Sequence, residues 1–153
     1  MRRCILCIGN RDGGDDAIGP YIADHLPSTK TRKVIDAGTV PENFTGVIKQ
    51  FAPKQLIIID AVDMGLQPGD IRIVPKNCIG TMHISTHGIP LSVIIKYLQQ
   101  DIPSILLIGI QPKEMQHHLS SHLKKSGHDL IALLLDNQIN TIKYVESVPE
   151  YKK

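Results

Sequence analysis

Several features that would place this 153-residue chain in a broad class of proteins are missing from it. It has only three cysteines, at irregular spacing, whereas a secreted disulfide scaffold is richer in cysteine. Its formal net charge of +2 is too small to indicate a nucleic-acid partner or a charged membrane surface. No apolar run reaches the length of a transmembrane helix, and the N-terminus lacks a signal-peptide cleavage pattern. We therefore expect a cytoplasmic protein.

Common ligand-binding motifs are also missing. The loop after the first apolar run has one glycine where a dinucleotide fingerprint needs three, and no Gly-x-Ser-x-Gly elbow occurs. An EF-hand opening at Asn10 would need a bidentate Glu where Tyr21 stands. Cys4 and Cys7 lie three residues apart in a predicted strand, so they point to opposite faces and cannot clasp one metal. We expect both to be buried thiols.

The chain does contain a succession of short apolar runs and amphipathic helical patterns. Its hydrophobic content of 42% suits one core, and no linker or repeat divides it, so we expect a single domain over residues 1–153. The patterns predict strands at 4–8, 34–36, 56–60, 71–74 and 104–110. They predict helices at 18–26, 44–51 and 91–98. They also predict a last helix that opens at Ser126 with a capping-box-like spacing to Asp129, and its apolar pattern continues to Ile142.

The order of these elements predicts a three-layer α/β/α sandwich. Its centre is an about five-stranded, mainly parallel twisted sheet with helices on both faces. The link at 61–69 is too short for a helical crossover, so the strand at 71–74 is expected to run antiparallel to the others.

Polar residues are predicted to gather where the parallel strands end, which is where open sheets of this kind bind ligands. The loop at 9–19 carries three carboxylates against one arginine, so it would repel a phosphate and attract a cation. The candidates at this edge are Asp16 after the first strand, Asp36 and Asp60 at the ends of the second and third, and His87 at the start of the helix before the fifth. Two carboxylates and an imidazole suit a borderline metal with open positions. Each residue also has an ordinary explanation as a cap, a turn residue or a surface histidine.

Five segments in order from Gly9 to Pro112 resemble the [NiFe]-hydrogenase maturation endopeptidases. They are Gly9-Asn10 followed by Asp15-Asp16 and Gly19, then Asp36-Ala37-Gly38-Thr39, Ile58-Ile59-Asp60-Ala61, Thr86-His87 and Gly109-Ile110-Gln111-Pro112. Each segment alone is weak, and five in order are specific. The stretches at 41–43, 60–65 and 109–112 are most similar to the branch that serves the hydrogenase-3, or formate-hydrogenlyase-type, large subunit.

The resemblance implies an endopeptidase that removes a short C-terminal extension from the hydrogenase large-subunit precursor after nickel insertion. It implies that Asp16, Asp60 and His87 contact nickel and that Asp36 matters for activity in an unassigned role, and we predict these four as the catalytic set. The substrate would supply the nickel, and the resting enzyme would be apo. We expect no nucleic-acid or membrane partner, and a monomer or weak homo-oligomer.

In the loop at 9–19 we interpret Gly13 and Gly14 as making room for a docked protein tail, and Asp15 as capping or orienting the helix start. Two alternative functions stay open. A hydrolase of peptidyl-tRNA hydrolase-like type also has Gly-Asn after its first strand, and it would need a basic groove beside Asn10. A non-catalytic nickel-binding maturation chaperone would hold the metal without cutting.

Overall fold

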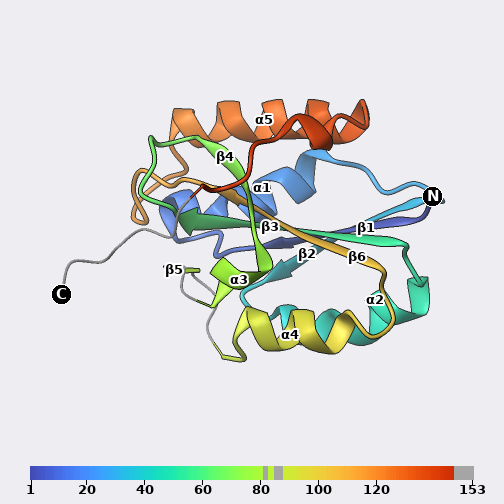
Figure 1. Cartoon of the computed structure of the whole chain (residues 1–153). Coiled ribbons are helices and arrows are strands. Elements are labelled where there is room, and N and C mark those ends of the chain that lie inside the picture. Colours follow the sequence, from blue (N-terminus) through green and yellow to red (C-terminus); the bar gives the residue numbers. More distant parts are fainter. Residues whose placement is uncertain (81–82, 85–87, 147–153) are drawn as a thin grey trace.

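Helices cover both faces of a twisted central sheet, as Figure 1 shows for a computed structural model of the chain. The structure describes residues 1–80, 83–84 and 88–146. Helices α1 (Ile18–His25) and α5 (Ser121–Leu135) lie on one face, and α2 (Thr45–Phe51) and α4 (Leu91–Leu98) lie on the other. The predicted three-layer α/β/α architecture is confirmed.

The sheet carries most of its strands in parallel. The strands are β1 (Arg3–Ile8), β2 (Arg32–Gly38), β3 (Gln55–Asp63), β4 (Ile71–Val74), β5 (His83–Ile84) and β6 (Ser104–Ile110). Their order is β2-β1-β3-β6-β4, with β5 pairing the end of β3. The pairs β1–β2, β1–β3 and β3–β6 are parallel, whereas β4 runs antiparallel to β6 at one edge, as the short link before it predicted.

The remaining elements are short. They are α3 (Lys76–Ile79) and the 3-10 helices η1 (Gly14–Ala17), η2 (Pro41–Phe44) and η3 (Ile139–Thr141). Neither α3 nor β5 was predicted, because elements of four and two residues are too short to show a hydrophobic period. No helix in the part of the chain that the structure describes is long and apolar enough to cross a membrane.

Alternation along the central strands divides the core into two clusters, one on each face of the sheet. Cys4 packs in the cluster beneath α2 and α4, whereas Cys7 packs in the cluster beneath α1 and α5. Both side chains are fully buried, and burial raises the pKa of the Cys4 thiol to about 12. The prediction that these cysteines are separate core thiols is confirmed.

The last helix begins earlier than predicted. Its N-cap is Ser120, whose hydroxyl oxygen accepts the Leu123 N–H at 3.4 Å. Ser126 instead lies inside α5, where its buried hydroxyl donates to the Gly69 carbonyl at 2.6 Å. The spacing of Ser126 and Asp129 is therefore not a helix start, because a tertiary hydrogen bond uses the hydroxyl.

The last helix also ends earlier than its apolar pattern predicts. It stops at Leu135, and Asn137 then takes a left-handed φ of 56°. Ile139 and Ile142 continue the apolar pattern, but they lie in a 3-10 turn and its extended exit. Both remain buried in the same cluster as the helix, so burial extends beyond helical structure.

Strand β3 extends further than predicted. Asp60 was expected at its end, but the strand continues to Asp63. Ala61 still pairs with Ile110 of β6, and Val62 pairs with Ile84 of β5. Asp60 is consequently a fully buried strand residue and not a turn residue.

Candidate functional site

The loop after β1 turns tightly and places Asp16 beside the carboxyl end of that strand. The Asn10 carbonyl accepts the Gly13 N–H at 3.0 Å, and the Gly13 carbonyl accepts the Asp16 N–H at 3.1 Å. The Asn10 N–H donates to Asp16 Oδ2 at 3.0 Å. Asp16 is only 5% exposed, so this turn presents one carboxylate from a nearly buried position.

Two glycines of the motif allow the loop to pack this closely. A Cβ on Gly9, which has a φ of 154°, would lie 1.9 Å from the Asp16 carbonyl oxygen. A Cβ on Gly19 would lie 2.1 Å from the Ile8 carbonyl oxygen, so α1 can rest directly on β1 only with glycine there. The spacing of glycines and aspartates in this segment therefore reflects backbone contact as well as chemistry.

Asp60 lies on β3, the strand that pairs with β1 on the side away from β2. Its neighbours Ile58 and Val62 belong to the cluster beneath α2 and α4, so alternation directs Asp60 toward that face. The 3-10 helix η1, which carries Asp16, packs against β3. Asp60 is fully buried, and a buried carboxylate in a protein is ordinarily paired or bound to a metal.

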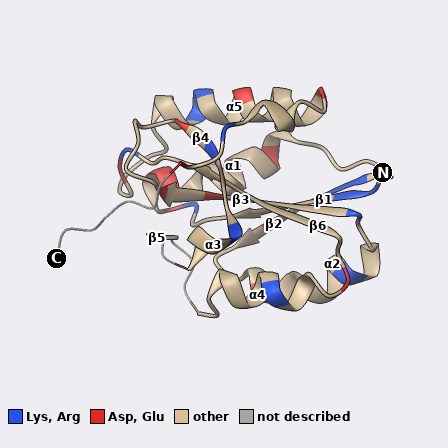
Figure 2. Ribbon diagram, viewed as in Figure 1, with Lys and Arg blue, Asp and Glu red and all other residues tan. Residues whose placement is uncertain are grey.

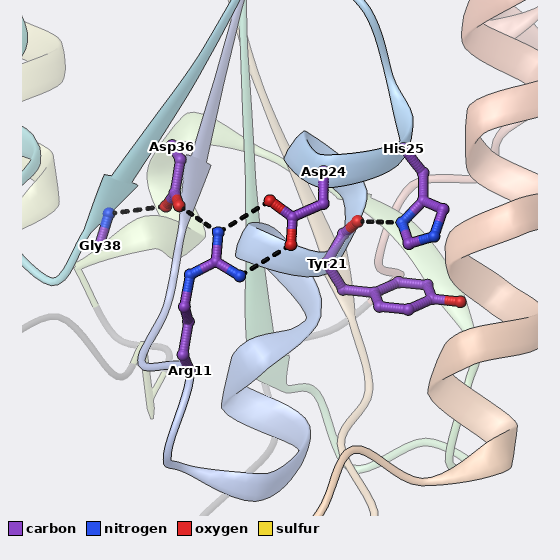
Figure 3. A network of polar contacts seen from close by, with 6 residues as sticks. All are labelled: Arg11, Tyr21, Asp24, His25, Asp36 and Gly38. Carbon is purple, nitrogen blue, oxygen red and sulfur yellow. Dashed lines mark hydrogen bonds and ion pairs between the residues drawn. The ribbon is translucent and has the colours of Figure 1, made fainter.

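Asp36 lies on β2, on the other side of β1, and it contacts Arg11. It was expected at the end of its strand, but β2 continues to Gly38, which still pairs with Ile8 of β1. Arg11 Nη2 lies 2.6 Å from Asp36 Oδ2, and the Gly38 N–H donates to Asp36 Oδ1 at 3.1 Å. The same guanidinium makes a two-pronged contact with Asp24 of α1, at 2.7 and 2.8 Å. Figure 3 shows Arg11 between the two carboxylates. Asp24 was not predicted as a site residue, because it is an exposed residue of its helix and belongs to no motif.

These contacts shift the pKa values of the groups involved. Hydrogen bonds to Asp24 and then to Asp36 raise the pKa of Arg11 above its ordinary value. The hydrogen bonds from Arg11 lower the pKa of Asp24. The cluster is therefore a cation held between two carboxylates.

Removal of the guanidinium in Arg11→Ala is expected to raise the pKa of Asp24. A carboxylate whose folded pKa is depressed adds stability above its unfolded pKa of about 3.9 and loses it as pH falls through the folded value. A carbon-detected NMR titration of the Asp24 carboxyl group would measure both proteins. Equal midpoints in wild type and variant would show that the ion pair does not persist in solution.

Asp15, next to the site, has a different task. Its Oδ2 accepts the N–H groups of Lys113 and Glu114 at 2.7 and 3.1 Å, and its Oδ1 accepts the Ser120 N–H at 2.7 Å. Asp15 thus anchors the segment between β6 and α5 from its fully buried position. The expectation that it caps or orients the helix after the first loop is wrong, because within the described part of the chain no side chain caps η1 or α1 and the Asp15 carboxylate binds distant backbone. It binds instead at the start of α5, where Ser120 is the N-cap.

The space beside Gly14 is filled by the protein itself. A Cβ on Gly14, which has a φ of 61°, would lie 2.5 Å from the Gln116 carbonyl oxygen. The interpretation that this glycine makes room for a docked protein tail is therefore wrong, since the 113–120 segment occupies that room.

Gln111 belongs to the last of the five segments that resemble the family, and its side chain has a structural role. Its Oε1 accepts the N–H groups of Met64 and Leu66 at 2.6 and 3.2 Å, and its Nε2 donates to Asp63 Oδ1 at 3.2 Å. The buried amide therefore ties the carboxyl end of β6 to the turn that follows β3. Gln111 therefore holds the backbone beside the candidate site in place. The spacing of residues in the sequence did not reveal this role.

An open pocket of about 360 Å³ lies between the first loop and the end of β2. Its lining residues are Gly9, Asn10, Arg11, Asp36, Ala37, Gly38 and Thr39. The one cation among them is paired with two carboxylates, and Figure 2 shows Lys and Arg spread over several elements. The basic groove that a peptidyl-tRNA hydrolase-like enzyme needs beside Asn10 is not formed by these lining residues.

The third predicted metal contact cannot be placed, because His87 lies outside the described residues. The helix α4, which covers the face that Asp60 points to, begins at Leu91. Within residues 1–80, 83–84 and 88–146, no three His, Cys, Asp or Glu side chains gather into a metal-binding group. The two predicted contacts among these residues, Asp16 and Asp60, therefore do not make up a metal-binding group by themselves.

Comparisons with known proteins give consistent results. A family model described as hydrogenase maturation protease matches residues 20–137. The hydrogenase 3 maturation protease of Escherichia coli (strain K12) is 41% identical over 115 residues, which cover 73% of this chain and 74% of that protein. The solution structure of the endopeptidase HycI from Escherichia coli has a TM-score of 0.85 at 32% identity, covering 99% of this chain and 100% of that chain. The crystal structure of a [NiFe] hydrogenase maturation protease HycI from Thermococcus kodakarensis has a TM-score of 0.79 at 31% identity. The match covers 90% of this chain and 92% of that chain.

Proposed function

This chain belongs to the hydrogenase maturation protease family, and we propose that it removes a C-terminal extension from the precursor of a [NiFe]-hydrogenase large subunit after nickel insertion. The nickel arrives with the precursor as part of the substrate. Asp16, Asp60 and His87 contact it, and the remaining coordination positions are filled by the substrate's own ligands.

The observation that supports this proposal is the position of two carboxylates. Asp16 and Asp60 are almost completely buried, and η1 brings the first against the strand that carries the second. Both lie near the carboxyl ends of parallel strands, where open α/β sheets bind their ligands. Contact with solvent therefore does not account for a charged residue at either position.

The donor set suits nickel in its divalent state. Carboxylate oxygens and an imidazole nitrogen bind borderline divalent ions, and three protein ligands leave positions open for a substrate. Nickel so held polarises the scissile carbonyl or activates a water, or it serves as an anchor while a carboxylate carries out the acid–base step. In each case the carboxylates must meet a metal that is already bound to the precursor.

Thiol catalysis does not fit this chain. Cys4, Cys7 and Cys78 are all buried. Burial raises the pKa of Cys4 and Cys7, which disfavours the reactive thiolate. A metal-directed hydrolysis agrees better with the carboxylates at the sheet edge.

Cleavage is expected only when the precursor carries nickel. To test this, the protein is incubated with a [NiFe]-hydrogenase large-subunit precursor that retains its C-terminal extension. The precursor is supplied in a nickel-loaded and in a nickel-free form. Mass spectrometry then measures release of the extension. Equal cleavage of both forms would contradict recognition of nickel.

The same experiment tests the nickel-binding chaperone. A chaperone would bind the nickel-loaded precursor and release no extension over the time in which a protease completes the reaction. Binding without cleavage would therefore replace the proposed function with that alternative.

A further inference from the structure

We propose that Arg11 is a positioning residue, which holds the loop after β1 in place, and that the contribution of Asp36 to cleavage depends on Arg11. The inference rests on the proposed function and assigns a role to an acidic residue that has none so far. Arg11 does not touch the scissile bond in this proposal, since its guanidinium is directed toward the flanking elements (Figure 3).

The guanidinium of Arg11 contacts two carboxylates at once. Arg11 contacts Asp24 through both of its terminal nitrogens, at 2.7 and 2.8 Å, and it contacts Asp36 at 2.6 Å. Asp24 belongs to α1 and Asp36 to β2, so one side chain joins the loop to two separate elements. A planar fork can bind two carboxylates at once, whereas a lysine ammonium behaves as a point charge.

The backbone of the loop connects Arg11 to Asp16, the candidate nickel ligand. Arg11 lies between Asn10 and Asp12 in the hydrogen-bonded turn of the loop. The Asn10 N–H donates to Asp16 Oδ2 at 3.0 Å, and the Asp12 N–H donates to Asn10 Oδ1 at 2.9 Å. A change in the position of Arg11 therefore reaches Asp16 through the backbone of Asn10.

Asp36 accepts a hydrogen bond at each of its carboxylate oxygens. Its Oδ2 accepts a hydrogen bond from Arg11 Nη2, and its Oδ1 accepts one from the Gly38 N–H. Both carboxylate oxygens are therefore already engaged as hydrogen-bond acceptors. The engagement of Asp36 with Arg11 favours a role in holding the loop over a role as general base.

The three side chains are partly exposed, at 54% for Arg11, 48% for Asp24 and 33% for Asp36. Exposed ion pairs add little to global stability. We therefore expect Arg11→Ala to loosen the loop without unfolding the protein, so that its effect can be measured in a folded variant.

Amide hydrogen exchange tests the positioning role without any substrate. The amides of Asn10, Gly13 and Asp16 are expected to exchange about 10-fold faster in Arg11→Ala. Adding Asp36→Asn to that variant should cause no further increase. As a matched control, Lys125→Ala removes an exposed ion pair with Asp129 on α5 and should leave the loop amides unchanged. Unchanged loop exchange in Arg11→Ala would overturn the proposal whether or not the precursor is cleaved.

Cleavage of nickel-loaded precursor tests the dependence of Asp36 on Arg11. We expect Arg11→Ala to lower kcat/KM about 10- to 100-fold, as displaced catalytic groups do, and Asp36→Asn to add nothing in that background. Arg11→Lys should restore part of the loss, because one carboxylate can still be reached. The inference would be overturned if the double variant lost kcat/KM by the product of the factors measured for Arg11→Ala and Asp36→Asn alone. If the wild-type protein does not cleave, the proposed function fails, and the exchange measurement alone decides the role of Arg11.

Discussion

Replacing Asp16 by asparagine is expected to slow cleavage of the nickel-loaded precursor by at least about 100-fold, a loss typical of removing one preorganised electrostatic contact. The asparagine retains an oxygen that can accept the Asn10 N–H, so the turn is preserved. The charge that would contact nickel is lost. Initial rates of extension release measure the effect, and circular dichroism checks the fold.

A neighbouring carboxylate provides the control for Asp16. Asp12 is an exposed residue of the same loop, and Asp12→Asn removes the same charge without changing a buried position. Its cleavage rate should stay within about twofold of wild type, as for most exposed substitutions. If Asp16→Asn cleaves as fast as Asp12→Asn, Asp16 is not a nickel contact.

Replacing Asp15 by asparagine is expected to lower the free energy of unfolding by about 3 kcal/mol, because hydrogen bonds to a buried charged group are lost. Its carboxylate accepts three backbone N–H groups, and an asparagine would direct an NH₂ group at one side of this set. The negative charge also lies at the N-terminus of α5, where the helix dipole favours it. Urea unfolding followed by circular dichroism measures the change.

The matched control for Asp15 lies on the helix that it anchors. Asp129 is exposed on α5 and pairs with Lys125 at 3.3 Å. Asp129→Asn should change the free energy of unfolding by no more than about 0.5 kcal/mol, as for exposed ion pairs. A loss of less than about 1 kcal/mol for Asp15→Asn would contradict the anchoring role, since three charge-assisted bonds contribute more than that.

Asp15 and Asp16 are adjacent in sequence and differ in the effect that we expect. The motif contains both, and no sequence rule separates a metal contact from a structural anchor when both are aspartate. The difference depends on the partners of each carboxylate, and those of Asp15 lie about a hundred residues away, at 113–120. Long-range partners leave no local pattern in the chain.

Several elements were predictable for a physical reason. The strand at 104–110 was predicted with its observed bounds, because a continuous apolar run is typical of a strand covered on both faces. The antiparallel β4 followed from the length of the link before it. The start of α5 was predicted at the wrong residue because Ser126 has the chemistry of a helix cap. Its hydroxyl instead donates a hydrogen bond to the carbonyl of Gly69 in a distant loop.

The sequence by itself determined the layered fold, the separation of Cys4 from Cys7, and the family, because hydrophobic period and ordered motifs are local properties of the chain. Only the tertiary structure decided that Asp60 lies inside a strand, that Asp15 anchors α5, and that Arg11 joins Asp24 to Asp36. These assignments depend on contacts between residues far apart in sequence. The same aspartate can be a ligand, an anchor or one half of an ion pair, and its role is set by the groups that the fold places around it.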